Sequence, residues 1–182
     1  MRIYTDLDET LIANVVRNGE VVDVIPRPGM QWFLKTLSQH GDLWLLTKGN
    51  MPHVRQAFRK MGKAPSLFKG VISHETMRPI EEQIEVVVET PGLTNDQRQD
   101  LYDSIPPIAP HGVHFDDYPF ESPIGALKSK TIGINEDKWI QVDAYLPGSV
   151  DRQGLKRAYS EFVSRFGSQG FDLGRKRALA WL

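Results

Sequence analysis

The sequence predicts an α/β protein built on a doubly wound, mostly parallel β-sheet. Short apolar runs typical of strands alternate along the chain with segments whose apolar residues recur at i, i+3, i+4 and i+7, the spacing of an amphipathic helix. Several of the helical segments stop at a glycine, a common helix terminator. The run at 43–47 is continuously apolar, as expected for a strand covered on both faces. With 182 residues we expect one domain over 1–182.

The first half of the chain alternates strands and helices regularly. A strand over residues 3–5 leads into an acidic turn. Asn18-Gly19 between two valine-rich arms predicts a β-hairpin over about residues 12–25, which would form a small flap. After Pro28-Gly29 we expect a helix carrying Met30, Phe33, Leu34 and Leu37, then a strand over 43–47, a helix over 54–61 and a strand over 70–73.

The second half is less regular. Residues 81–89 favour a helix by their charges and a strand by their three consecutive valines, and the sequence alone leaves both open. Thr94 predicts the cap of a helix that continues to Leu101, and the prolines after it predict a loop. We expect the remaining elements to be strands over 113–115, 131–134 and 139–142, and a long helix at about 150–167.

Composition excludes several classes of protein. The net charge of −1 gives no bulk attraction to nucleic acid or to a membrane, and no apolar run approaches the roughly 18 residues of a membrane-spanning helix. The absence of cysteine excludes a thiolate nucleophile, a disulfide framework and a cysteine-based zinc site. Because the first strand begins within the first three residues, we expect no signal peptide, and a cytoplasmic location is compatible with these features.

Two carboxylates, Asp6 and Asp8, directly follow the first strand. Residues i and i+2 of a strand point the same way, so both carboxylates and the Thr10 hydroxyl are expected in one small volume. Like charges that close together are unfavourable unless a cation or a shared proton relieves them, and carboxylate oxygens suit Mg²⁺. The alternative is an ordinary acidic turn at the end of a strand.

Polar residues also end two other predicted strands. Thr47 ends the strand over 43–47, and Asp116-Asp117 follow the strand over 113–115. Each has a simpler explanation, since Thr47 could terminate a strand or cap a helix and the acidic pair could form a turn before Tyr118-Pro119. Because ligands of such sheets bind at the carboxyl ends of the strands, their coincidence predicts a site for phosphate and Mg²⁺.

With these motifs the sequence resembles the haloacid dehalogenase (HAD) superfamily, most of whose members are Mg²⁺-dependent phosphatases with a Rossmann-like core. The resemblance covers about residues 1–135 and rests on Asp6-x-Asp8-x-Thr10, on Leu45-Leu46-Thr47-Lys48-Gly49 and on Phe115-Asp116-Asp117. Within the superfamily, the first motif together with Arg27-Pro28-Gly29 and Asp116-Asp117-Tyr118-Pro119 is most similar to the RNA polymerase C-terminal-domain phosphatases, whereas the segment over 68–75 is more similar to general HAD hydrolases.

The resemblance implies a role for each motif residue. Asp6 would be the nucleophile that forms an aspartyl-phosphate, and Asp8 the acid and then the base. Thr47 and the amide of Lys48 would hold phosphoryl oxygens. The implied metal site for Mg²⁺ consists of Asp6, the backbone carbonyl of Asp8, Asp116 and, in support, Asp117.

One expected part is missing from the sequence. The family places a lysine between the third strand and the second acidic pair, but no lysine occurs between Lys69 and Lys128. Arg78 is the first candidate to bind the phosphate in its place, and Arg98 the second. Among the other polar residues, His111 and His114 are explained by the start of a strand beside prolines, and the basic residues 175–177 by a solvated tail.

The sequence therefore predicts a phosphomonoester hydrolase without a large cap domain. The segments before Thr47 and between Arg78 and Asp116 are too short to form a separate domain, so the site would be open to a phosphate on a protein or nucleic-acid end as well as to a small phosphomonoester. The alternatives are a nucleotide or nucleic-acid-end phosphatase and a catalytically inactive HAD-like binding module. The physiological substrate and the oligomeric state do not follow from the sequence.

Overall fold

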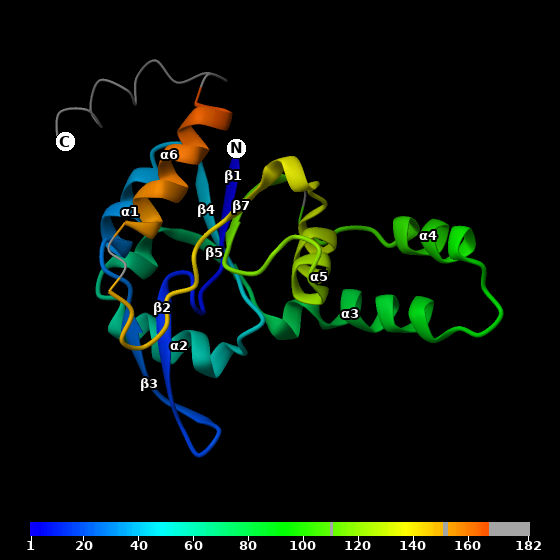
Figure 1. The fold of residues 1–182 in the computed structure, drawn as a ribbon, viewed down its shortest axis with the longest axis horizontal. Helices are drawn as coiled ribbons and strands as arrows, with labels where there is room; N and C mark the ends of the chain where they lie inside the picture. Colours follow the sequence, from blue (N-terminus) through cyan, green and yellow to red (C-terminus); the bar gives the residue numbers. More distant parts are fainter. Residues whose placement is uncertain (110, 151–152, 168–182) are drawn as a thin grey trace.

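A computed structural model describes residues 1–109, 111–150 and 153–167 of the chain. Its centre is a five-stranded parallel sheet of order β5-β4-β1-β6-β7 (Figure 1). The strands are β1 (Arg2–Thr5), β4 (Asp42–Leu46), β5 (Phe68–Ile72), β6 (Gly112–Asp116) and β7 (Trp139–Gln141). In the central strand, Thr5 lies opposite Leu45 of β4 and Phe115 of β6, so three strands end side by side at one edge. The predicted fold class is confirmed.

Helices cover both faces of this sheet. The first face carries α1 (Met30–Leu37), α2 (Met51–Lys60) and α6 (Gly154–Phe166), and the second carries α3 (His74–Glu89) and α5 (Pro123–Ile132). Consecutive residues of a strand face opposite layers, and accordingly Ile3 packs in the first layer and Tyr4 in the second. Two short 3₁₀ helices, η1 (Ala64–Leu67) and η2 (Glu136–Lys138), precede β5 and β7.

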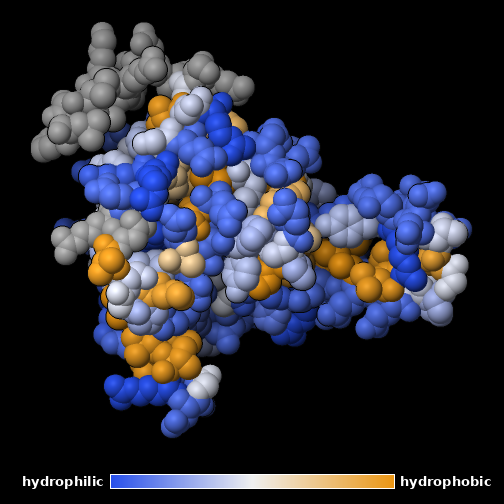
Figure 2. Space-filling model, viewed as in Figure 1, coloured by the Kyte–Doolittle hydropathy of each residue, from blue (hydrophilic) through white to orange (hydrophobic). Residues whose placement is uncertain are grey.

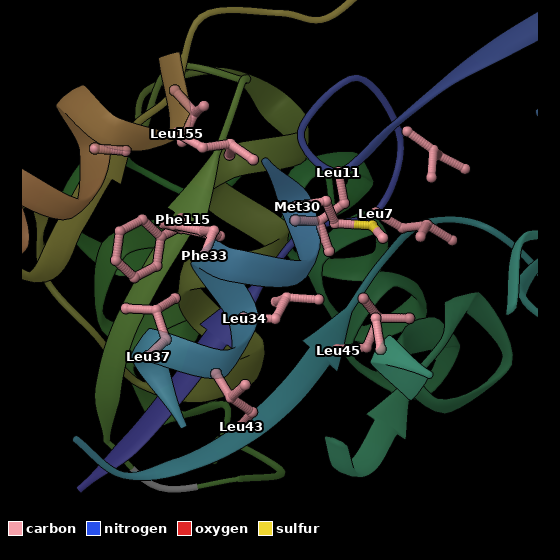
Figure 3. Packing of buried hydrophobic residues seen from close by; sticks show 14 of the residues in the cluster. Leu7, Leu11, Met30, Phe33, Leu34, Leu37, Leu43, Leu45, Phe115 and Leu155 are labelled. Carbon is pink, nitrogen blue, oxygen red and sulfur yellow. The ribbon is translucent and has the colours of Figure 1, made fainter. Parts of the chain in front are cut away.

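The larger core lies between α1 and the sheet. Figure 3 shows Phe33 and Leu34 of α1 directed toward the strands, and the rings of Phe33 and Phe115 meet edge to face with centroids 5.2 Å apart. The apolar spacing of α1 places Met30, Phe33, Leu34 and Leu37 on its buried face. Full burial of one such side chain contributes about 1.5–3 kcal/mol, so this layer fixes β1, and with it the residues at its end.

The predicted hairpin consists of β2 (Ile12–Arg17) and β3 (Glu20–Pro26). Asn18 and Gly19 at its turn both have positive φ, 51° and 80°, which is the backbone conformation that Asn-Gly turns supply. The hairpin leaves Val16, Val22 and Ile25 exposed, and apolar side chains cover part of its surface in Figure 2.

Between β5 and β6 the chain forms a helical arm, defined here as α3 together with α4 (Asn95–Ser104), whose far end projects away from the sheet (Figure 1). Residues 81–89 are helical, and Thr94 caps α4 through a capping box with Gln97. Arg98 donates hydrogen bonds to the carbonyls of Val87, Val88 and Thr90 and so closes the last turn of α3. Apart from this arm and the hairpin, the described residues form no large extra domain.

One predicted strand is wrong. Residues 131–134, whose β-branched side chains favoured a strand, contain the end of α5 and the turn after it. Ser122 caps this helix, Pro123 occupies its first turn, and Gly133 ends it in the left-handed conformation (φ 59°). These caps, together with the burial of Ile132 against the second face of the sheet, outweigh the strand propensity.

The basic residues 175–177 lie outside the described residues. Among the helices of the described residues, none combines the length and the apolar character needed to cross a lipid bilayer.

The α1 layer generates a prediction about stability. Leu34→Ala should lower the free energy of unfolding by about 2–5 kcal/mol, because it deletes buried methyl groups and leaves a cavity. Leu101→Ala on α4, where the leucine is 44% exposed, is the control and should change it by less than about 1 kcal/mol. Urea unfolding of both variants measures the difference, and equal losses would contradict the assignment of the core.

Candidate active site

Three adjacent strand ends gather the polar residues that the sequence analysis singled out. Asp6 follows β1 and keeps its N–H hydrogen-bonded to the carbonyl of Phe115 at 2.8 Å. Thr47 follows β4, and its N–H donates to the carbonyl of Ile72 at 2.9 Å. Asp116 is the last residue of β6. The backbone hydrogen bonds of the sheet therefore fix the backbone position from which each of these side chains extends.

The turn after β1 sends the chain back across this edge of the sheet. Glu9 has a φ of 59°, in the left-handed region that costs a non-glycine residue roughly 1–2 kcal/mol. The Glu9 N–H donates to the Ile12 carbonyl at 2.7 Å, and the Glu9 carbonyl accepts from the N–H of Tyr145 at 2.6 Å. These bonds hold the strained turn, and Asp8 precedes it immediately.

A buried lysine bridges the two groups of acids. The Lys128 ammonium lies 2.8 Å from Oδ1 of Asp6 and 2.7 Å from Oδ2 of Asp116, and all three side chains are at most 3% exposed. Lys128 belongs to α5, after the acidic pair in sequence, and not to the segment before it. Sequence reasoning missed this residue because it did not recognise α5.

The cation between the two groups of acids is Lys128 and not one of the two arginines considered from the sequence. Arg78 is exposed on α3, and Arg98 is engaged in closing the end of that helix. The position between the two acidic groups belongs to Lys128, which reaches it from the second face of the sheet. The signal available in the sequence was Ser122-Pro123 followed by Gly133, the start and stop of a helix.

Asp116 accepts three hydrogen bonds. Its Oδ2 accepts from Nε2 of the fully buried His114 at 2.7 Å as well as from Lys128, and its Oδ1 accepts from the Tyr118 N–H at 2.9 Å. Trp139 packs edge to face on the His114 ring, with centroids 4.5 Å apart. His114, which the sequence analysis explained by its place at the start of a strand, therefore orients one of the site acids. His111 hydrogen-bonds the Gly133 carbonyl and does not reach this group.

The electrostatics of the group show a surplus of negative charge. Burial, and then the charges of Asp116 and Asp8, raise the pKa of Asp6 well above its usual range despite the nearby Lys128. Burial and the charge of Asp116 raise the pKa of Asp117 to about 6. Burial alone would raise the pKa of Asp116, but Lys128 and His114 outweigh it and lower that pKa. One ammonium is too little positive charge for these carboxylates.

Asp8 has its own hydrogen-bond donors, which come from other elements than Lys128. His53 of α2 places Nε2 2.6 Å from its Oδ1, Asn14 of β2 donates to the same oxygen at 2.8 Å, and the Thr47 hydroxyl lies 3.3 Å from Oδ2. Burial would raise the pKa of Asp8, but these donors, His53 above all, lower it. The sequence analysis assigned no role to His53 or Asn14, since neither belongs to a recognised motif.

The site opens into a hollow of about 340 Å³. Lys48 contributes to its wall, with its ammonium paired to Glu81 of the helical arm at 2.5 Å. The lining comprises Asp6, Asp8, Glu9, Asn14, Val21, Lys48, Gly49, His53, Tyr118, Ile124 and Lys128. A larger hollow of about 450 Å³ lies beside Trp139 and Arg165, but none of Asp6, Asp8, Thr47 and Asp116 lines it.

The donor set fits a hard divalent cation. Carboxylate oxygens of Asp6, Asp116 and Asp117 lie within 4.8 Å of one another, and Asp117 is oriented by the Thr10 hydroxyl at 3.0 Å. Oxygen ligands and excess negative charge are what Mg²⁺ requires of a protein site. The residues present are therefore suited to Mg²⁺.

Comparisons with known proteins find similarity to a family of phosphatases. The family model of the NLI interacting factor-like phosphatases matches residues 3–88. No curated protein sequence matches the chain. Among solved structures, the fission yeast RNA polymerase II CTD phosphatase Fcp1 bound to beryllium fluoride is similar, with a TM-score of 0.44 and 18% identity, over 98% of this chain and 54% of that chain. This chain thus spans about half the length of that structure.

The bridging lysine generates a prediction. Lys128→Met should lower the free energy of unfolding by about 3–5 kcal/mol, because it leaves buried carboxylates without their cation. Lys60→Met is the control, since Lys60 forms an exposed ion pair with Asp23 at 3.1 Å, which is worth no more than about 1 kcal/mol. Chemical denaturation of both variants checks this. Similar losses would mean that the Lys128 bridge does not stabilise the fold.

Proposed function

Because the family model of the NLI interacting factor-like phosphatases matches residues 3–88, we propose that the chain is a phosphatase of the HAD type, which hydrolyses phosphomonoesters through an aspartyl-phosphate on Asp6 with the help of Mg²⁺. The observation that carries the proposal is that Asp6, Asp8 and Lys128 line one hollow, with Lys128 2.8 Å from Asp6 and the Thr47 hydroxyl 3.3 Å from Asp8. Asp6 and Asp8 are the reacting groups. Thr47 orients the phosphate, and Lys128 offsets negative charge on Asp6.

In the first step Asp6 attacks phosphorus. A carboxylate oxygen of Asp6 forms a bond to phosphorus, the bond from phosphorus to the leaving oxygen breaks, and Asp8 gives that oxygen a proton. Lys128 supports the step because its ammonium, 2.8 Å from Asp6, offsets negative charge where the nucleophile and the phosphate meet. The sheet fixes Asp6 through the hydrogen bond between its N–H and Phe115.

In the second step water attacks the aspartyl-phosphate. Asp8 now accepts a proton from the water, inorganic phosphate leaves, and the Asp6 carboxylate is restored. We assign Thr47 and the backbone amide of Lys48 to holding phosphoryl oxygens, since both line the turn after β4 beside Asp8. Arg78 as a further phosphate ligand stays a prediction.

Mg²⁺ would be held by Asp6, Asp116, Asp117 and the backbone carbonyl of Asp8. When bound, it would reduce the repulsion between the Asp6 anion and the phosphate dianion. The raised pKa values of Asp6 and Asp117, caused first by burial and then by neighbouring carboxylates, support this assignment, because a bound cation would offset both effects. The single domain over 1–182 and the cytoplasmic location likewise stay predictions.

The surroundings of the site favour a phosphate carried on a larger molecule. No large domain covers the hollow in the described residues; Asn14 and Val21 of the β2–β3 hairpin line it, and Lys48 in its wall pairs with Glu81 of the helical arm. Exposed Val16 and Val22 on the hairpin, near Val21 in the wall, offer apolar area beyond a phosphate group (Figure 2). We propose a phosphorylated protein segment as substrate, with a nucleotide or nucleic-acid end as the alternative.

The catalytic assignment is tested by removing the nucleophile and the metal. Asp6→Asn should abolish hydrolysis of p-nitrophenyl phosphate, because the amide keeps the shape and loses the charge and nucleophilicity. Asp8→Asn should lower turnover by about 10²- to 10⁴-fold, the usual contribution of a proton-transferring group. EDTA should stop wild-type turnover, and added Mg²⁺ should restore it.

Asp96→Asn, an exposed change on α4, serves as the control and should turn over the same substrate normally. Full activity of Asp6→Asn, or of wild type in EDTA, would contradict the proposal. Inactivity of wild type toward every phosphomonoester tested would favour the binding module instead.

The choice of substrate is tested on the hairpin. Replacing Val16 and Val22 by serine should lower kcat/KM for phosphorylated peptides by about tenfold, if about 1.4 kcal/mol of apolar contact is lost. The kcat/KM for p-nitrophenyl phosphate should stay unchanged, because that molecule is too small to reach both valines. A free metabolite hydrolysed with kcat/KM near the diffusion limit, about 10⁸ M⁻¹s⁻¹, would refute the proposal of a large substrate.

A further inference from the structure

We propose that His53 is a positioning residue for Asp8: it anchors one carboxylate oxygen so that the other, Oδ2, is the atom that exchanges the proton with the leaving group and with water. This inference rests on the proposed phosphatase function. It adds a residue outside the recognised motifs, since His53 follows Asp8 by 45 positions and comes from a different layer of the fold.

The two oxygens of Asp8 have unequal partners. Oδ1 accepts from His53 at 2.6 Å and from Asn14 at 2.8 Å, whereas Oδ2 has, among the described residues, a single and longer contact at 3.3 Å with the Thr47 hydroxyl. A carboxylate only accepts hydrogen bonds, so Nε2 of His53 carries the hydrogen. Oδ1 is thereby occupied, and Oδ2 is left for the reacting oxygen.

The backbone fixes His53 at this distance. His53 is the third residue of α2, and its N–H donates to the capping side chain of Asn50 at 3.0 Å. The neighbouring Pro52 occupies the first turn, where proline is preorganised for a helix. The ring therefore projects from the rigid start of a helix and is only 15% exposed.

Gly49 supplies the space that this arrangement needs. A Cβ atom at Gly49 would lie 2.9 Å from Cδ2 of His53, 3.2 Å from the Thr47 hydroxyl and 3.4 Å from Oδ2 of Asp8. The first distance is shorter than atoms tolerate, so a side chain at this position would displace the His53 ring. The Gly49 N–H also donates to the Thr47 hydroxyl at 2.9 Å, which directs the hydroxyl hydrogen toward Asp8.

The chemical consequence depends on the leaving group. An alkyl alcohol leaves only if Asp8 protonates it as its bond to phosphorus breaks, so a misplaced Asp8 slows this step. A nitrophenolate leaves without protonation, and for it Asp8 matters mainly afterwards, as the base for water. Loss of the His53 anchor should therefore discriminate between substrates by their leaving groups, which a merely structural role would not do.

The experiment compares p-nitrophenyl phosphate with a phosphoserine peptide, with Mg²⁺ present. His53→Ala should lower kcat/KM for the phosphoserine peptide by about 10- to 100-fold, part of the roughly 10²- to 10⁴-fold that a general acid contributes. For p-nitrophenyl phosphate, kcat/KM should stay within about threefold, while kcat and KM fall together because the aspartyl-phosphate accumulates. His53→Gln, whose amide still donates to Asp8, should recover part of the loss.

His74→Ala is the control, because His74 also lies at the start of a helix but contacts Glu81, at 3.3 Å, and not Asp8. This variant should change kcat/KM only slightly, and by the same factor for both substrates. The inference would be overturned if folded His53→Ala lost kcat/KM equally for both substrates. If thermal unfolding shows that the alanine variant does not fold, the same comparison is made with His53→Gln. Wild type inactive on both substrates would instead overturn the proposed function, and this inference with it.

Discussion

The ion bridge from Asp6 through Lys128 to Asp116 is the interaction on which the rest of this structure depends. It joins the end of β1 to the end of β6 and holds α5 against the second face of the sheet. A buried bridge of this kind repays the loss of hydration only when the geometry is good and the remaining hydrogen bonds are made. Here His114 and the Tyr118 amide make them, so the packing around Trp139 is tied to the charge balance of the site.

Most of the fold followed from local patterns. The apolar spacing of α1, the Asn-Gly turn of the hairpin and the capping residue of α4 each depend on neighbours in sequence, and each element formed where it was expected. The α5 helix did not, because its β-branched end at Thr131 and Ile132 suggested a strand while its caps and burial decide the structure. Local propensity fails where tertiary packing outweighs it.

The site, like the fold, contains residues that could be predicted from the sequence and residues that could not. Residues at strand ends could be predicted to converge, since parallel strands share one edge, and the acids and Thr47 do lie together. Lys128, His114 and His53 could not be found by that rule, because each reaches its acid from a helix or from within a strand. Motifs specify the groups that meet the substrate, whereas the partners that set their charge and orientation are dispersed along the chain.

The helical arm is joined to the rest of the protein so that its outer turns can change without a change in the strands that hold the site. Its inner part is held to the body by Met77 in the second layer, by the ion pair between Glu81 and Lys48, and by a small apolar cluster of Ile80, Ile105 and Leu127. Beyond that cluster both helices carry mostly exposed residues, so lengthening or rewriting their outer turns would alter what the rim meets without disturbing β1 or β6. The arm is therefore a natural point at which descendants of this sequence could diverge in specificity while retaining the same chemistry.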